Sequence, residues 1–295
     1  MRTISKITLY ILIILLGVYI LAPFGWILVC SFRPERDLFY VPPQWVPRRV
    51  TLDNYNYIFT GKIPEGFEMG SGGLTARISE KARYILPGLR NSSIIALSVM
   101  IINLVFGTMA AYTFSRIKFK GSLPAYMFIL GTRLLPPIAI AVPFYRIVQS
   151  LGLIDTHIAL ILAHSTFTLP FTVWFLTLYL KNVPPSLEEA ALVDGCTRLK
   201  ALLHIVIPVA IPALAAAAVF ALMFSFNEFL FALFLTPTIK SQTLPVIVAD
   251  VSVNPDVSYA LMSACIVLSI IPLLLFALIF RNYITRGLIT TLRMK

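Results

Sequence analysis

The sequence predicts an all-α polytopic membrane protein, and three observations carry this prediction. Hydrophobic residues make up 58% of the 295 residues and charged residues only 13%, whereas a soluble domain carries about 25% charged residues. The mean hydropathy is +0.87. Long apolar runs recur along the chain with basic residues near their ends, which is typical of helices that cross a lipid bilayer.

Six apolar segments are long enough to span, because a transmembrane helix needs about 20 predominantly apolar residues. The expected spans cover residues 8–31, 91–115, 123–148, 157–180, 205–235 and 258–280. The first follows Arg2 and Lys6, is longer than the apolar core of a secretory signal, and has no small-residue cleavage site after it. It is therefore predicted to be an uncleaved span.

Prolines interrupt two of the expected spans. Pro136, Pro137 and Pro143 lie in the third, and Pro208 and Pro212 lie at the start of the fifth. A proline inside a helix removes a backbone donor and clashes with the preceding turn. In a bundle such breaks are tolerated where neighbouring helices or a cavity satisfy the freed carbonyls. We therefore expect both breaks to lie against such a neighbour.

The distribution of basic residues predicts which side of the membrane each loop faces. Six spans place both termini on one side, and Lys and Arg are concentrated at both termini and in the loops after the second and fourth spans. The loop after the third span, 152–156, has neither residue, and the loop after the fifth has only Lys240. Since cytoplasmic loops carry the excess of Lys and Arg, both termini and the loop 181–204 are expected in the cytoplasm.

This topology divides the chain into four parts. An N-terminal transmembrane helix covers residues 1–32, a periplasmic loop 33–90, a membrane core 91–282 and a cytoplasmic tail 283–295. The periplasmic loop contains the glycine-rich run 70–73, which lacks the Lys-Ser/Thr of a phosphate-binding loop. We expect a surface loop that caps the outer mouth or contacts an external partner.

The most polar stretch between apolar segments lies in the loop 181–204. Ser186 is expected to cap a short helix, with Glu188 and Glu189 in its first turn, where carboxylates suit the helix dipole. Gly195 permits a tight turn. A second helix then begins at Arg198 and enters the membrane. The small residues of this helix-turn-helix would admit another protein's surface, and Glu189 would pair with a basic residue there. An ordinary amphipathic connector is the alternative.

The spacing within this loop resembles a known signature. Glu-Ala-Ala at 189–191, then Gly195 after three intervening residues, and Ile-x-Ile-Pro at 205–208 after nine more match the loop of importer-type ABC transporter permeases, with Ile207 where the signature has Leu. Further segments resemble the carbohydrate-type permeases of the maltose-transporter family, specifically the smaller six-span subunit. These segments are Asn91-Ser92, Ala110-Ala111-Tyr112, Leu135-Pro136-Pro137, residues 151–156, Leu169-Pro170-Phe171, residues 224–229 and Arg286-Gly287-Leu288.

The resemblance implies a type I ABC importer permease fold in the cell inner membrane. The chain would move a carbohydrate or polyol-like solute inward by ATP-driven alternating access. The alternative is an importer for another small solute, such as a sulfonated sugar, a glycerol derivative or an opine. The implied partners are a second homologous permease subunit, two ATPase subunits that bind ATP and Mg, and an extracytoplasmic solute-binding protein. The residues implied in ATPase coupling are Glu188, Glu189, Ala190, Ala191, Asp194, Gly195, Ile205 and Pro208.

Polar residues inside the expected spans are candidates for the solute pathway, because intramembrane ionisable groups usually face the bundle interior or a water-filled cavity. Arg133 lies beside the break in the third span, and Asn227 and Glu228 interrupt the fifth. Phe224 offers a flat apolar face for a sugar ring. Interhelical hydrogen bonding, or snorkelling to the membrane interface, is the alternative for each polar residue.

Other classes of function find little support in the sequence. The net charge of +11 does not indicate nucleic-acid binding, because the basic residues follow span ends. Cys30, Cys196 and Cys265 stand alone, and the three histidines are scattered, so no metal, disulfide or catalytic site is predicted. An enzyme would need acidic and histidine groups that converge. A self-sufficient channel or secondary transporter would not need the ATPase-coupling loop.

Overall fold

The structure is a computed structural model that describes residues 2–42, 44–63, 80–253 and 258–293, without the side chains of 2–5 and 282–293. The glycine run 70–73 and the side chains of the predicted tail lie outside this description. Every regular element in the described part is helical, which confirms the all-α prediction. The chain forms two compact units, residues 1–86 with 247–271 and residues 87–246 with 272–295.

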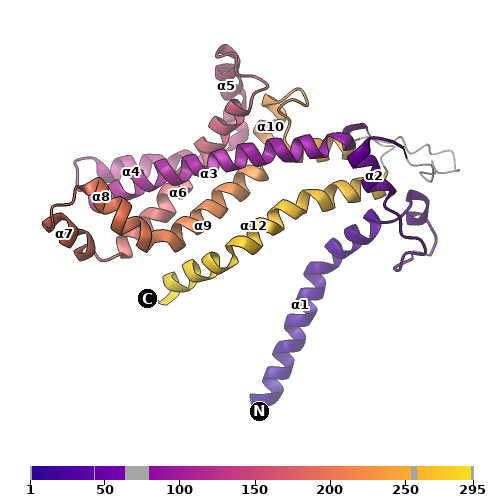
Figure 1. Cartoon of the computed structure of the whole chain (residues 1–295), viewed down its shortest axis with the longest axis horizontal. Coiled ribbons are helices and arrows are strands. Elements are labelled where there is room, and N and C mark those ends of the chain that lie inside the picture. Colours follow the sequence, from indigo (N-terminus) through magenta and orange to yellow (C-terminus); the bar gives the residue numbers. More distant parts are fainter. Residues whose placement is uncertain (1, 43, 64–79, 254–257, 294–295) are drawn as a thin grey trace. The chain divides into compact units, whose positions relative to one another are not determined.

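The apolar helices agree with the six predicted spans (Figure 1). Five are long enough to cross a membrane, and the bent pair α4 and α5 supplies a sixth if it counts as one span. The five cover Lys6–Ser31, Glu80–Arg116, His157–Asn182, Arg198–Phe226 and Tyr259–Arg281. Helix α3 (Ile85–Arg116) starts six residues before the predicted boundary at 91, because helical structure continues into the preceding loop.

The third span is broken where its prolines predict. Helix α4 (Ser122–Gly131) and the 3₁₀ turn η3 (Thr132–Leu134) lead to α5 (Pro137–Ser150), and the two parts meet at 98°. Leu135 and Pro136 are both extended, as expected of residues that precede a proline. Pro137 takes the first helical position of α5, where its missing N–H costs nothing.

The fifth span accommodates its first proline differently. Helix α8 (Arg198–Ala201), the π-helical turn η4 (Leu202–Val206) and α9 (Ile207–Phe226) form one apolar segment. The π turn lies directly before Pro208, and such turns absorb a disturbed hydrogen-bond ladder. The chain then leaves the helix at Asn227 and resumes in α10 (Leu230–Leu235).

Small residues let the helices of the larger unit pack closely. Ala210, Ala213 and Ala217 on α9 are at most 2% exposed and belong to one apolar cluster with residues of α3 and of α6 (His157–Asn182). On α3, a methyl group added at Gly107 would lie 2.7 Å from Cγ2 of Thr172 on α6. Since membrane helices associate through close packing, these residues fix α3, α6 and α9 as a bundle.

The smaller unit is held by polar contacts at the end of α1 (Arg2–Ser31). Helix α2 (Asp53–Thr60) places Asn54 so that its Nδ2 donates to the carbonyls of Ser31 at 3.0 Å and Arg33 at 3.1 Å. These bonds satisfy carbonyls that the helix end leaves without partners. The apolar side chains of α1 are exposed, as expected of a helix that lipid surrounds.

Glu35, in the 3₁₀ turn η1 (Glu35–Leu38), caps the N-terminus of α12 (Tyr259–Arg293). Its carboxylate accepts hydrogen bonds from Tyr259 N at 2.9 Å, Ala260 N at 2.8 Å and Ser258 Oγ at 2.7 Å. A carboxylate at a helix N-terminus pairs with both the orphan amides and the helix dipole. The contact joins segments that are 224 residues apart in sequence.

We predict that Glu35→Ala lowers the stability of the protein by about 1–2 kcal/mol, because the first turn of α12 loses its cap. Amide hydrogen exchange in the segment 259–264 should accelerate, and the midpoint of thermal unfolding in detergent should fall. Unchanged exchange in that segment would show that the carboxylate does not hold the helix end.

Candidate functional site

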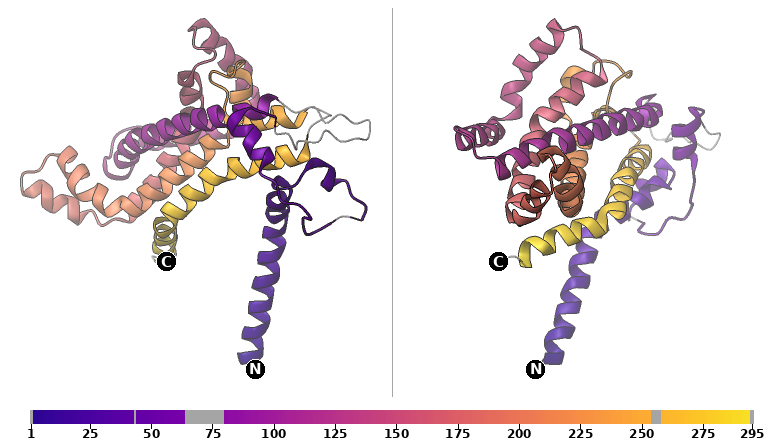
Figure 2. Two further views of the ribbon diagram at one scale, coloured as in Figure 1. Left: turned by 45° about the vertical axis from the view of Figure 1, so that its right-hand side comes forward. Right: turned by 60° about the vertical axis from the view of Figure 1, so that its left-hand side comes forward.

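The predicted helix-turn-helix is present at one end of α3 and α6 (Figures 1 and 2). Helix α7 (Ser186–Val193) is followed by a turn and then by α8. The prediction that Ser186 caps α7 is wrong. Pro185 occupies the cap position and its carbonyl accepts from the amides of Glu188 and Glu189, each at 3.0 Å. Ser186 is already helical, so it cannot act as the flanking cap.

Two capping motifs make the turn after α7 specific. Gly195 is left-handed, with φ of +86°, and its N–H donates to Leu192 O at 3.1 Å while Cys196 N donates to Ala191 O at 3.0 Å. This bond pair is the Schellman motif, in which glycine avoids the strain of a side chain. Thr197 then caps α8 by accepting from Lys200 N at 3.4 Å.

The residues of α7 divide between two faces. Glu188 is 5% exposed and Ala191 6% exposed, whereas Glu189 and Ala190 are exposed and Val193 is 87% exposed. Residues at spacings of three and four share a helix face, so Glu189, Ala190 and Val193 form one outward face. Of the other predicted coupling residues, Asp194 and Gly195 lie exposed in the turn, and Ile205 and Pro208 lie in η4 and at the start of α9.

Glu188 is held by the end of α3. Its carboxylate accepts a hydrogen bond from the Tyr112 hydroxyl and lies 3.3 Å from Nε of Arg116. Arg116 also donates from Nη2 to the Val183 carbonyl at 2.7 Å, just after α6. Arg198 Nη1 lies 4.0 Å from the same carboxylate. Tyr112 and Arg116 were not predicted, although their spacing of four residues at the end of a span placed them on one face.

A second candidate site lies where the two broken spans meet. A cavity of about 340 Å³ is bounded by η3, α5 and α6 and by the break between α9 and α10. Its lining residues are Arg133, Leu135, Pro137, His164, Phe167, Thr168, Phe224, Glu228 and Phe231. The proline break of the third span and the polar break at Glu228 in the fifth span therefore lie against a cavity, whereas Pro208 and Pro212 do not line it. Three of the four predicted pathway residues contribute to its wall.

Arg133 is held in this wall by aromatic rings. Its guanidinium carbon lies 5.8 Å from the ring centre of Phe171 and 5.7 Å from that of Phe224, and Nη1 donates to the Phe167 carbonyl at 2.6 Å. Phe167 in turn packs on Phe231, with ring centres 4.9 Å apart. These contacts stabilise a cation and still leave guanidinium donors for another group. The ion pairs among the described residues do not include Arg133.

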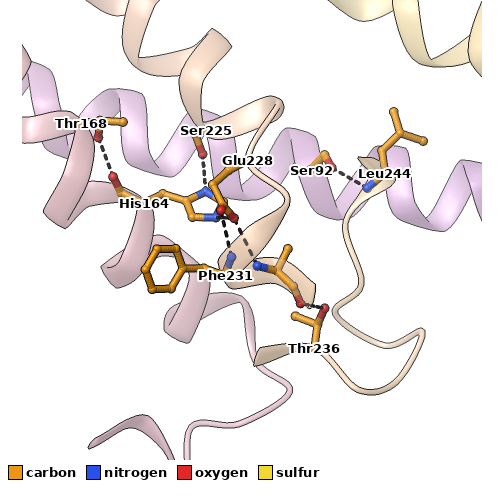
Figure 3. A network of polar contacts seen from close by, with 9 residues as sticks. Ser92, His164, Thr168, Ser225, Glu228, Phe231, Thr236 and Leu244 are labelled. Atoms are coloured by element: carbon orange, nitrogen blue, oxygen red, sulfur yellow. Dashed lines mark hydrogen bonds and ion pairs between the residues drawn. The ribbon is translucent and has the colours of Figure 1, made fainter. Parts of the chain in front are cut away.

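Glu228 and the buried His164 form a polar network beside the cavity (Figure 3). His164 Nε2 lies 3.0 Å from Glu228 Oε2, and Nδ1 lies 2.8 Å from Ser225 Oγ. Because a carboxylate only accepts, Nε2 carries the proton. Glu228 also accepts from Phe231 N at 2.9 Å and Ala232 N at 3.2 Å, so it caps α10. Its oxygens are largely committed to these partners.

Asn227 does not join the cavity wall. Its Nδ2 donates to the Met223 carbonyl at 2.9 Å, within its own chain segment, and the side chain is exposed. His164 is one of the three scattered histidines for which no metal or catalytic role was predicted, and its hydrogen bonds to Ser225 and Glu228 are consistent with a structural role. The pairing of His164 with Glu228 had no signal in the sequence, because 64 residues separate them.

Asp155 fastens the loop before α6 to the loop after α10. Its carboxylate accepts from Ser241 Oγ at 2.6 Å and from the amide and hydroxyl of Thr238, and its N–H donates to Leu235 O at 2.9 Å. Burial acts to raise the pKa of Asp155, but the hydrogen bonds from Ser241 and Thr238 and the charge of Lys240 outweigh it and lower the pKa. The backbone of Asp155 is left-handed, with φ of 61°.

This lowered pKa predicts a pH dependence. A carboxyl whose pKa falls on folding stabilises the protein above the pKa of the unfolded chain, about 3.9, and the contribution disappears as pH falls through the folded value. Asp155→Asn tolerates the same backbone and removes only the charge. The variant should unfold at a lower temperature than wild type at pH 7, and the difference should shrink below about pH 4. A difference that is constant between these pH values would contradict the assignment.

The described part of the chain contains no group of three or more His, Cys, Asp or Glu side chains that could hold a metal ion.

Comparisons with known proteins identify the family. Residues 103–290 match the model of the binding-protein-dependent transport system inner membrane component. The chain is 33% identical to a trehalose/maltose transport system permease of Thermococcus litoralis, over 97% of this chain and 96% of that protein. It is 32% identical to a trehalose transport system permease of Mycobacterium tuberculosis, over 92% and 91% of the two chains.

The fold of a solved structure agrees. A chain of a bacterial ABC transporter involved in the import of the acidic polysaccharide alginate superposes with a TM-score of 0.74 at 19% identity, over 96% of this chain and 97% of that one. At this identity the likeness establishes the type I permease fold. Together with the family match over most of the membrane core, it leads to one conclusion: the chain belongs to the inner-membrane permease components of binding-protein-dependent ABC transport systems.

Proposed function

We propose that this permease imports a carbohydrate, with a disaccharide as the first candidate. The observation that carries the proposal is the 33% identity to a trehalose/maltose permease over nearly the whole of both chains. The cavity beside the broken spans is consistent with it. Phe167, Phe224 and Phe231 offer apolar faces to a sugar ring, and Arg133 offers donors to hydroxyl oxygens.

Energy for transport would come from partner subunits. We infer that two ATPase subunits bind ATP and Mg, that this chain binds neither, and that the outward face of α7 docks on one ATPase. Glu189 supplies a charge for a basic partner residue, and Ala190 admits close approach. Closure of the ATPases would move α7 and switch the solute pathway between outward-open and inward-open states as a rigid body.

The remaining partners follow from the same scheme. A second, homologous permease subunit would complete the pathway, and an extracytoplasmic binding protein would deliver the solute. The positive-inside distribution of Lys and Arg supports a cytoplasmic location for α7 and both termini. The periplasmic side would then carry the loops that Asp155 joins.

An acidic sugar is the second candidate, and Arg133 favours it. The side chain carries a charge into the cavity wall, and a sulfonate or carboxylate is the strongest partner for a guanidinium. Glu228 does not compete for Arg133, because its oxygens are engaged by His164 and the amides of α10.

The test is ATP-driven uptake by the reconstituted complex. The chain, its partner permease, both ATPases and the binding protein would be placed in proteoliposomes with radiolabelled trehalose, maltose, a sulfonated sugar and an amino acid. We expect ATP-dependent uptake of a disaccharide and none of the amino acid. Uptake of the sulfonated sugar alone, lost in Arg133→Met, would favour the second candidate. Uptake of the amino acid alone would refute a carbohydrate importer.

A further inference from the structure

The carboxylate of Glu188 points into the bundle, although most residues of α7 are exposed. Glu188 is the neighbour of Glu189 in sequence, yet the two side chains serve opposite faces of α7. Burying a carboxylate is costly unless charged or hydrogen-bonding partners surround it. Tyr112 and Arg116 supply these partners, and their side chains are themselves buried.

Three helices meet on this one group. Tyr112 and Arg116 belong to α3, and Arg116 also holds the Val183 carbonyl at the end of α6. The other buried side chain of α7 is Ala191, a single methyl group that can transmit little directional force. A charge-assisted hydrogen bond is directional and stronger than a neutral one. Among the described residues, the Glu188 carboxylate therefore makes the strongest side-chain interaction between α7 and the bundle.

Helix α3 leads from this link to the cavity wall. Asn103 lies nine residues before Tyr112, which corresponds to about 13.5 Å along a helix. Its Nδ2 donates to Thr168 Oγ1 at 2.7 Å, and Thr168 lines the cavity. Both side chains are buried. A movement of the Tyr112 end of α3 would thus reach the cavity through a rigid helix and a buried hydrogen bond.

We propose that Glu188 is a positioning residue that carries the movement of α7 to α3 and α6 through Tyr112 and Arg116. This inference rests on the proposed docking of α7 to an ATPase. In this scheme the exposed Glu189 contacts the ATPase, and the buried Glu188 transmits the movement to the bundle. Loss of the contact between Glu188 and Tyr112 would leave the complex assembled and able to hydrolyse ATP. It would lower the amount of solute moved per ATP.

The test compares two tyrosines in the full complex in proteoliposomes. Tyr112→Phe removes only the hydroxyl that bonds Glu188. Tyr179→Phe is the matched control, since Tyr179 lies in the same bundle and its hydroxyl makes a 3.4 Å contact with Val209 O. We expect Tyr112→Phe to lower solute uptake per ATP by about tenfold, as the loss of a hydrogen bond to a charged group would. The control should match wild type, and both complexes should assemble equally.

A double variant separates transmission from simple stability. If Glu188 and Tyr112 act as one link, Glu188→Gln with Tyr112→Phe should lower uptake per ATP no more than the worse single variant. Wild-type uptake per ATP in Tyr112→Phe would overturn the inference. Failure of Tyr112→Phe to assemble, while the control assembles, would also overturn it, because the role would then be structural. A wild-type complex without ATP-driven uptake would refute the proposed function instead.

Discussion

Glu189→Lys should abolish both solute uptake and the substrate-stimulated hydrolysis of ATP, while the chain still inserts into the membrane. Glu189 is exposed on the outward face of α7 beside Ala190, and it makes no contact that holds the bundle together among the hydrogen bonds and ion pairs of the described residues. A lysine there would face the basic residue that we expect on the ATPase, and juxtaposed like charges cost several kcal/mol at an interface.

Gly195→Asp should give the same phenotype by a different route. No atom lies within 4 Å of the position of the new Cβ, but the φ of +86° lies beyond the left-handed region of about +50° to +70° that Asp can adopt, so the substitution would strain the Schellman turn. Uptake, stimulated ATPase activity and recovery of the membrane-inserted complex would be measured together. Wild-type uptake in both variants would refute the assignment of α7 as the ATPase contact.

Glu228→Leu should destabilise the protein by about 3 kcal/mol, because buried donors that lose their hydrogen-bond acceptor are left without a partner. The substitution would strip His164 of its acceptor at Nε2 and leave the amides of Phe231 and Ala232 without a cap. We expect a lower yield of folded chain in detergent and a lower midpoint of thermal unfolding. Solute uptake would fall with the amount of folded protein.

Asn227→Leu is the control for this prediction. Asn227 is adjacent in sequence and of similar polarity, but it is exposed and bonds only the Met223 carbonyl of its own helix turn among the described hydrogen bonds. Its unfolding midpoint should remain close to that of wild type. If both variants lost the same stability, the loss would come from replacing any polar residue in this segment and not from breaking the His164–Glu228 network.

Hydrophobicity made the spans predictable, since each must supply about 20 apolar residues whatever its neighbours are. The break in the third span was predictable for an equally local reason, because Pro136 and Pro137 force an extended backbone before the next helix. The start of α3 was misplaced because the helix extends beyond the apolar residues into the preceding loop.

The division of labour between Glu188 and Glu189 could not be predicted, because it depends on the rotation of α7 relative to α3. The pairing of His164 with Glu228 depends in the same way on which faces of α6 and the α9–α10 break meet. Such contacts join residues 64 to 76 positions apart, and no local pattern encodes them. The sequence predicted individual pathway residues but not the cavity that they form. Of these residues, Arg133, Phe224 and Glu228 line the cavity and Asn227 does not.

Photo-crosslinking from α7 tests the central claim most directly. In a chain with Cys196→Ser, a cysteine would replace either Ala190, on the outward face, or Ala191, which is 6% exposed. Each would be labelled with a maleimide that carries a benzophenone before assembly, and the assembled complex would then be irradiated. We predict a crosslink from position 190 to an ATPase subunit and none from position 191. A crosslink from position 190 only to the partner permease, or none, would contradict the account.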